Sequence, residues 1–199
     1  MYTVDFFRNF TQFQDIEEMD LHQFILFFDR EIVNRRYTYI NSQGKIKSIK
    51  IEFRRDNFPH LIGLQYWNNL PTKQATKQYD FLLSGKWDFE YLKKADKKSF
   101  EEFKKRFELL PFFYQMFYEW KCEIKLTQKE SNRGFKSRGV DMVFRKDNSD
   151  TSYLLELRQT GPDKFTYKPV SISDHILNSS SMQAKYLPLR ITDVLIEEI

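Results

Sequence analysis

The spacing of hydrophobic residues changes along this chain, and that change limits the folds it can adopt. Two stretches place hydrophobic residues at intervals of three and four: Leu21, Phe24, Ile25, Phe28 and Ile32, and then Phe100, Phe103, Phe107, Leu110, Tyr114 and Phe117. This spacing predicts amphipathic helices over about 15–35 and across 100–117, the second with a break or restart at Pro111. The last third alternates hydrophobic and polar residues instead, which predicts strands.

Four segments of the last third show the strand pattern: 122–126, 140–144, 153–157 and 165–172. Turn-like residues separate them, and Pro169 in the fourth indicates a sheet edge or a bulge. The segment 187–196 fits either a strand or a helix. We therefore expect an antiparallel sheet of about four strands.

The first part also contains a hairpin and further helices. Residues 37–53 read as strand, turn and strand, with Gly44 in the turn. Residues 3–14 and 72–85 look helical, the second ending at Gly85. The order predicts an α+β fold with N-terminal helices and a hairpin, then the sheet, with helices packed on one of its faces. We expect one domain over 1–199, with a helical and hairpin part to about 120 and a sheet part from about 121.

Composition excludes several protein classes. No hydrophobic run approaches the roughly 20 residues that span a bilayer, and the N-terminus lacks the pattern of a secretory signal. With one cysteine, Cys122, the chain cannot hold an internal disulfide. A reducing, cytoplasmic location follows as an expectation. The 20 phenylalanines indicate either an aromatic core or a surface on which bases stack.

Basic residues are concentrated in one region. Between Lys93 and Arg138 the net charge is +6, whereas the whole chain carries +4. A local basic excess is typical of a surface that binds phosphates, although a solvated helix face gives the same pattern. The candidate nucleic-acid-binding residues are Lys121, Lys125, Lys129, Arg133 and Lys136.

Common catalytic and cofactor motifs are missing from the sequence. The three histidines have no paired spacing, and there is no HExxH, CxxC, GxxxxGK[ST], GxGxxG or GxSxG motif. We expect neither a cofactor nor a zinc site, and the abundant carboxylates leave an acidic Mg²⁺ site open. Cys122 lies within a strand pattern, which favours a core residue over a nucleophile.

His60, which we expect at the end of a strand and its turn, is the strongest candidate for acid–base chemistry. A histidine titrates near neutrality, so it can take the proton from a ribose 2′-hydroxyl or return it, while lysine and arginine stabilise the phosphoryl oxygens. Segment 132–139 offers three such cations, and Arg158 and Lys168 lie on nearby predicted strands. A histidine beside Leu61 and Ile62 can equally be a structural, capping residue.

Residues 51–64, read as IEFRRDNFPHLIGL, resemble the F-x(4)-NFxHLxGL hallmark of the fourth group of phage-borne Barnase–EndoU–colicin E5/D–RelE-like (BECR) nucleases. We call residues 57–64 the hallmark segment, or the hallmark. The downstream layout is also similar over roughly 15–199: a helix ending in LSG, a helix around Arg106, an LELR strand and a KPVS strand. The resemblance implies a BECR-like sheet with packed helices. It also implies cleavage of RNA or tRNA without a metal ion, in toxin-like or host-conflict roles of phages and mobile elements.

The resemblance also suggests catalytic residues. His60 matches the family's histidine by motif, and Lys77 matches a recurrent basic residue of the following helix. Arg138, Arg158 and Ser171 match by layout. In this interpretation His60 is the general base or acid, the three cations bind the phosphate, and Ser171 positions it. The chain departs from the pattern after Leu64, where Gln65-Tyr66-Trp67 stands in place of an expected lysine.

Two other functions stay open. One is a phage or mobile-element inhibitor without enzymatic activity that binds a host defence protein or nucleic acid. The other is a DNA- or RNA-binding module whose binding depends on salt but not on sequence. We therefore expect RNA as a partner, with a protein inhibitor or a host protein as a further partner and no membrane.

Overall fold

The computed structural model describes residues 2–11, 15–118, 123–127, 140–161, 163, 165–176 and 186–199. The chain divides into two compact units. We call Met1–Val33 with Arg54–Tyr114 the helical unit, and Asn34–Phe53 with Gln115–Ile199 the sheet unit. The predicted catalytic residues His60 and Lys77 belong to the first, and Arg158 and Ser171 belong to the second.

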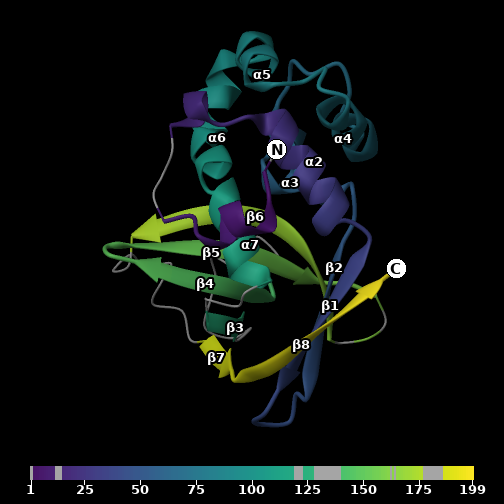
Figure 1. Cartoon of the computed structure of the whole chain (residues 1–199), viewed down its shortest axis with the longest axis vertical. Coiled ribbons are helices and arrows are strands. Elements are labelled where there is room, and N and C mark those ends of the chain that lie inside the picture. The colour runs from purple at the N-terminus through teal and green to yellow at the C-terminus, as the bar shows by residue number, and fades with distance from the viewer. Residues whose placement is uncertain are drawn as a thin grey trace. The chain divides into compact units, whose positions relative to one another are not determined.

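The helical unit is a set of short helices joined by turns and loops (Figure 1). Its elements in chain order are α1 (Val4–Arg8), the 3₁₀ helix η1 (Ile16–Glu18), α2 (Leu21–Glu31), α3 (Asn57–Leu61), the 3₁₀ helix η2 (Leu64–Tyr66), α4 (Ala75–Leu83), α5 (Phe89–Ala95), α6 (Lys97–Glu108) and most of α7 (Leu110–Phe117).

Aspartate caps start three of these helices. Asp20, Asp88 and Asp96 each accept a hydrogen bond from a backbone N–H three residues later, at the starts of α2, α5 and α6. A capping carboxylate satisfies an N–H group that the first helical turn leaves without a partner. Gly85, at a φ of 71° just after α4, ends that helix as predicted.

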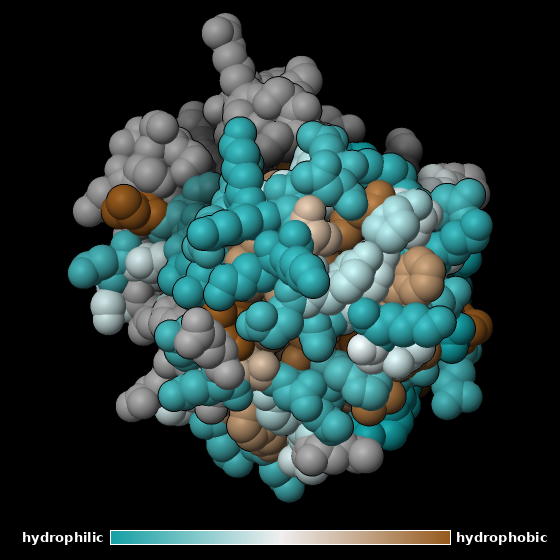
Figure 2. All heavy atoms as spheres, turned by 90° about the horizontal axis from the view of Figure 1, so that it is seen from above, coloured by the Kyte–Doolittle hydropathy of each residue, from teal (hydrophilic) through white to brown (hydrophobic). Residues whose placement is uncertain are grey.

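Aromatic rings fill much of the interior of the helical unit. Phe24, Phe58 and Phe107 are almost completely buried, and Phe58 packs against the rings of Phe28 and Tyr79. These contacts favour the core explanation for many of the phenylalanines. Among the coloured residues of Figure 2, most of the visible surface is hydrophilic, with small hydrophobic areas between.

The sheet unit contains one eight-stranded sheet, strongly curled in Figure 1, with the strand order β7-β3-β4-β5-β6-β2-β1-β8. The strands are β1 (Arg35–Asn41), β2 (Ser48–Phe53), β3 (Glu123–Thr127), β4 (Met142–Asn148), β5 (Thr151–Gln159), β6 (Thr166–Ile176), β7 (Tyr186–Leu189) and β8 (Ile191–Glu198). Neighbours run antiparallel except β2 and β6, which are parallel.

The α+β class is confirmed, but the sheet is larger than the expected four strands. The predicted hairpin forms as β1 and β2, with Gly44 in its turn at a φ of 79°, and it joins the same sheet through β6. The C-terminal segment supplies β7 and β8. Each joins by pairing with a strand distant in sequence, a relation that local periodicity does not encode.

The end of α7 packs against the sheet within the sheet unit. The ring of Phe117 contacts those of Tyr37 and Phe53, and the Tyr39 hydroxyl donates to the Phe117 carbonyl. The predicted restart near Pro111 is correct, because α6 ends at Glu108 and α7 begins at Leu110.

Candidate functional site

The hallmark segment forms α3 and the turn after it, rather than the strand end with a turn that we expected. The Asn57 side chain accepts a hydrogen bond from the backbone N–H of Arg54 at 2.8 Å, which fixes the entry to the helix. Gly63 then turns the chain at a φ of 83°. A Cβ atom placed there would lie 2.6 Å from Cδ1 of Phe103, so the turn requires glycine for both its angle and its close approach.

His60 differs from the rest of the hallmark in its exposure. Of residues 57–64, seven are buried and His60 alone is half-buried. Among the residues described, none exchanges a hydrogen bond with its imidazole, so the ring caps no backbone group of that set. Its backbone carbonyl accepts from the N–H of Gly63 at 3.1 Å. The segment therefore presents one titratable side chain from a buried framework.

Lys77 lies exposed on α4 in the same unit. The next two residues, Gln78 and Tyr79, are buried and anchor the helix. The Tyr79 hydroxyl donates to Asp29 at 2.9 Å. Burial, with the Asp29 carboxylate second, raises the pKa of Tyr79 well above its usual range. Tyr79 therefore stays a neutral, structural donor.

A second set of titratable groups lies on one face of strands β4, β5 and β6. Side chains two residues apart point to the same face, and paired residues share that face. The register pairs Glu156 with Ser171, Leu154 with Ser173, and Arg158 with Lys168. We define the polar sheet face by these residues together with Arg145 and His175: Arg145, Glu156, Arg158, Lys168, Ser171, Ser173 and His175.

The opposite face of the same strands belongs to the core, and the polar sheet face also carries two completely buried residues, Val143 and Leu154. Phe144, Leu155 and Ile172 pair across the opposite face and are completely buried. The register shifts between Glu156 and Leu157, because Leu157 pairs with Pro169 and Val170 is the extra residue. Pro169 therefore marks a bulge in an interior strand, where its missing N–H interrupts the ladder at little cost.

Three side chains form a hydrogen-bonded chain on the polar sheet face. Ser173 Oγ donates to Glu156 Oε1 at 3.4 Å and lies 3.1 Å from His175 Nε2. Because a serine hydroxyl has only one proton, Nε2 of His175 is the donor of the second bond. Glu156 is 2% exposed, whereas Ser173 and His175 are half-buried. A buried carboxylate thus orients a more accessible imidazole through a serine.

Arg145 on the same face is already engaged. Its Nε and Nη2 donate to the two oxygens of Asp147 at 2.7 and 3.0 Å, and Ser152 also donates to Asp147. Burial by itself would raise the pKa of Asp147, but the hydrogen bonds from Arg145 and Ser152 outweigh it and lower that pKa. Lys125 is likewise paired, with Glu123 at 2.5 Å.

The predicted site residues fall into separate groups in the structure. Arg158, which is exposed, and Ser171 share the polar sheet face, while His60 and Lys77 lie in the helical unit. Lys125 is on β3. The remaining predicted residues, Lys121, Lys129, Arg133, Lys136 and Arg138, lie outside the described residues.

Glu156 and His175 were not predicted as site residues. Glu156 interrupts an otherwise hydrophobic strand, and this signal was available in the sequence. The sequence contains no signal that Ser173 links Glu156 to His175, because that link depends on the register between β5 and β6.

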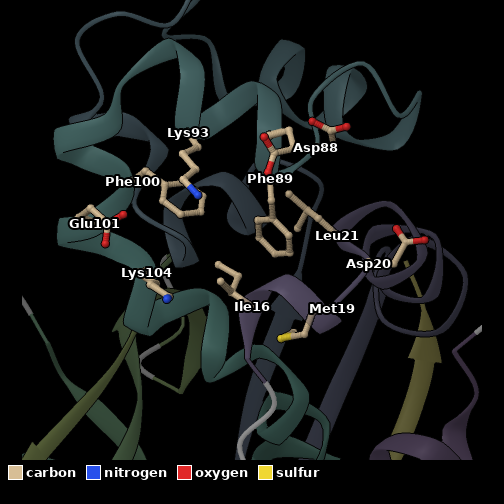
Figure 3. Close-up of a pocket in the computed structure, with 11 residues that line it drawn as sticks. Ile16, Met19, Asp20, Leu21, Asp88, Phe89, Lys93, Phe100, Glu101 and Lys104 are labelled. Atoms are coloured by element: carbon tan, nitrogen blue, oxygen red, sulfur yellow. The ribbon is translucent and has the colours of Figure 1, made fainter.

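Two cavities occur in the described part of the helical unit. The first, of about 540 Å³, is lined by η1, the start of α2, α5 and α6. Figure 3 shows the ring of Phe89 pointing into it, with Ile16 and Leu21 nearby. Two of its carboxylates, Asp20 and Asp88, are used as helix caps. The second cavity, of about 660 Å³, includes Tyr66, Phe103 and Arg106.

The described ranges contain neither a candidate metal site nor a candidate membrane span. No group of three or more His, Cys, Asp or Glu side chains there could hold a metal ion. No helix there is both long enough and hydrophobic enough to cross a bilayer.

Comparison with known families matches the chain to one of them. The model of the family described as phage-Barnase-EndoU-ColicinE5/D-RelE like nuclease 4 matches residues 20–191, which is most of the chain. No curated protein and no solved structure is similar enough to count as a match. The match includes the hallmark segment and the strands of the polar sheet face. The chain belongs to the phage-Barnase-EndoU-ColicinE5/D-RelE like nuclease 4 family.

Proposed function

We propose that this protein is a ribonuclease that cleaves RNA by attack of the ribose 2′-hydroxyl and needs no metal ion. The observation that carries the proposal is the chain of hydrogen bonds from Glu156 through Ser173 to His175. It orients an acid–base group on a strand that also carries Ser171 and Lys168. Family membership supports nuclease chemistry, and the polar sheet face offers side chains of the types that this particular reaction uses.

The reaction needs a proton acceptor, a proton donor and positive charge near the phosphate. A base removes the proton of the 2′-hydroxyl, and the 2′-oxygen forms a bond to phosphorus. The bond from phosphorus to the 5′-oxygen breaks, and that oxygen takes a proton from an acid. The products are a 2′,3′-cyclic phosphate and a free 5′-hydroxyl.

His175 is the acid–base group that we propose for the polar sheet face. Glu156 acts as a positioning residue, because it is buried and reaches the ring only through Ser173. Arg158 and Lys168 are paired neighbours on β5 and β6. Because Lys168 and His175 lie near opposite ends of β6, roughly 20 Å apart at the usual rise of a strand, both cations would bind phosphates of the RNA backbone away from the scissile one. Ser171, between them on β6, would position that backbone.

His60 is the second acid–base candidate, with Lys77 as a cation of the same unit. The supporting observation is that His60 is the only residue of the hallmark that is not buried. Arg138 stays a candidate phosphate ligand by its place in the family layout. The two histidines make separate predictions, so variants of each can be compared directly.

The test is cleavage of a labelled single-stranded RNA in the presence of EDTA. We expect His175→Ala to lower the cleavage rate about 10²- to 10⁴-fold, the usual contribution of a general acid or base. Glu156→Gln keeps the shape of the side chain but removes its charge. It should lower the rate less and change its dependence on pH.

His22→Gln is the matched control, because His22 is held by the carbonyl of Leu83 at 3.1 Å and lies outside the proposed site. It should keep full activity. If His60→Ala lowers the cleavage rate and His175→Ala does not, the acid–base group of the reaction is His60 in the helical unit. No cleavage by the unmodified protein would reject the proposal and favour an inhibitor or binding role.

A further inference from the structure

The second cavity of the helical unit has the size of a small-ligand site. Its volume of about 660 Å³ lies within the range of ligand pockets, roughly 300–1,000 Å³. The turn that follows the hallmark contributes Tyr66, Asn68 and Asn69, and α6 contributes Phe103 and Arg106. Two segments far apart in sequence therefore form its walls.

An exposed aromatic ring forms one wall of this cavity. Tyr66 stacks on Phe103 with a centroid distance of 5.5 Å and an angle of 6° between the rings. Tyr66 nevertheless keeps 58% of its surface exposed. A tyrosine held flat by one buried neighbour and open to solvent is suited to stacking on another planar group.

Arg106 fixes the stack to the hallmark helix. Its guanidinium lies 4.9 Å from the centroid of the Phe103 ring, and its Nη1 donates to the carbonyl of Leu61 at 3.3 Å. Leu61 follows His60 directly in the chain. Gly63 approaches the same Phe103 ring, so the geometry of the stacked ring depends on the hallmark turn.

The remaining lining groups suit the edge of a base and a phosphate. Asn68 and Asn69 are exposed amides, and an amide can donate and accept hydrogen bonds as base edges require. Lys98 and Arg106 balance the charges of Asp96 and Glu102. Asp96 already caps α6 through Ser99, so its carboxylate has a structural role.

We propose that this cavity binds one unpaired nucleobase of single-stranded RNA, with the base stacked on Tyr66. The amides of Asn68 and Asn69 contact its edge, and Lys98 contacts an adjacent phosphate. This inference rests on the proposed ribonuclease function and assigns a substrate-binding subsite to it. A duplex would not fit, because its bases are already stacked on one another and cannot reach the tyrosine.

The test measures binding separately from cleavage. The probe is a fluorescein-labelled 2′-O-methyl RNA of about ten nucleotides, a length within the site size of single-strand binders. It lacks the 2′-hydroxyl that would attack, so the protein cannot cleave it by the proposed reaction. Affinity is measured by fluorescence anisotropy for the full-length protein and its variants.

Tyr66→Leu removes the ring, and we expect it to weaken binding about 5- to 100-fold, the value of one stacked base. Tyr66→Trp keeps a planar ring and should bind within roughly threefold of the unmodified protein. The matched control is Tyr91→Leu. Tyr91 also stacks on an aromatic ring of the helical unit, that of Trp87 at 5.6 Å and 11°, but does not line this cavity.

Unchanged affinity in Tyr66→Leu, or an equal loss in Tyr91→Leu, would overturn the inference. Equal binding of a double-stranded version of the probe would also overturn it. If ordinary RNA is cleaved but Tyr66 has no effect on binding, the base site is wrong and the ribonuclease stands. If the probe binds through Tyr66 but no RNA is cleaved, the base site stands and the catalytic proposal fails.

Discussion

Within the hallmark, individual residues have different tasks. Asn57 holds the entry to α3 and Gly63 shapes the turn beyond it. Phe58 packs into the aromatic core. His60 alone is accessible enough to meet a substrate. A motif of this kind can therefore be retained mainly for packing, and only one of its positions is a direct candidate for chemistry.

Gly63 should be the more sensitive of two glycines in the helical unit. We expect Gly63→Ala to lower the free energy of unfolding by about 2–4 kcal/mol, since it combines a left-handed backbone with a clash against Phe103. Gly85 has a similar φ of 71°, but a Cβ atom there would lie at an ordinary contact distance of 3.4 Å from the His22 ring. Gly85→Ala should therefore lower the free energy of unfolding by only about 1–2 kcal/mol. Urea unfolding measures the loss of stability in both variants. Equal losses would contradict the close approach of Gly63 to Phe103.

Asp147 should contribute stability that depends on pH. Its pKa is lowered in the folded protein, so the contribution is present above the unfolded pKa of about 3.8 and is lost as the pH falls below it. We expect Asp147→Asn to cost about 0.5 kcal/mol at pH 7, because the carboxylate is 47% exposed. The difference should shrink at pH 3 in thermal unfolding. An equal loss of stability in Asp147→Asn at pH 7 and at pH 3 would argue against the ion pair with Arg145.

At the scale of elements, local periodicity accounts for much of the fold. The hydrophobic stripes predict α2 and α6 because each of these helices buries one face and the sequence repeats with that face. The stripe also predicts α7, although all of that helix is buried. The hairpin is predicted by Gly44 and by the alternation on each side of it. The alternating segments of the last third form β3 to β6, although Cys122 itself lies outside the described residues.

The misassigned hallmark segment has a local physical cause. We expected the end of a strand with its turn there, but the segment forms a short helix whose third residue is Pro59. The N–H groups of a first helical turn have no partner within the helix, so proline costs little there.

The polar sheet face required information that the sequence lacks. Which side chain meets Glu156 depends on pairing between strands and on a one-residue bulge at Val170. A shift of one residue would exchange the two faces. Arg158 and Ser171 were predicted from the family layout, and the register places them on the face that carries Glu156.

The end of α7 should depend on one hydrogen bond from the sheet. The Tyr39 hydroxyl donates to the Phe117 carbonyl, and Tyr39 is completely buried. We expect Tyr39→Phe to lower the free energy of unfolding by about 1–2 kcal/mol, because it leaves a carbonyl of a helix end without its donor. Chemical denaturation measures this loss. A change below about 0.3 kcal/mol would mean that the bond contributes nothing.

At the scale of the whole molecule, the net charge of +4 is too small to explain tight binding of nucleic acid by general attraction. Specific cations must then carry the interaction with phosphates. Arg158, Lys168 and Lys98 are the three that the two proposed sites use. Binding should therefore depend on salt, but only moderately.

We expect the logarithm of the affinity for single-stranded RNA to fall with the logarithm of the salt concentration with a slope of about −2, as three phosphate contacts produce. Lys98→Ala should reduce the slope by about 0.7. Anisotropy titrations over a range of salt measure it. A slope near zero would contradict phosphate binding at these sites.

In the proposed reaction, the 2′-hydroxyl of RNA is the nucleophile. The most direct measurement uses a short RNA with one preferred cleavage position and a matched RNA that carries a single 2′-deoxy sugar there, both incubated with the protein in EDTA. Attack by the 2′-hydroxyl should leave a 2′,3′-cyclic phosphate end on the first RNA and give no cleavage at that position of the second. Cleavage at the deoxy position, or a first product without the cyclic end, would contradict it.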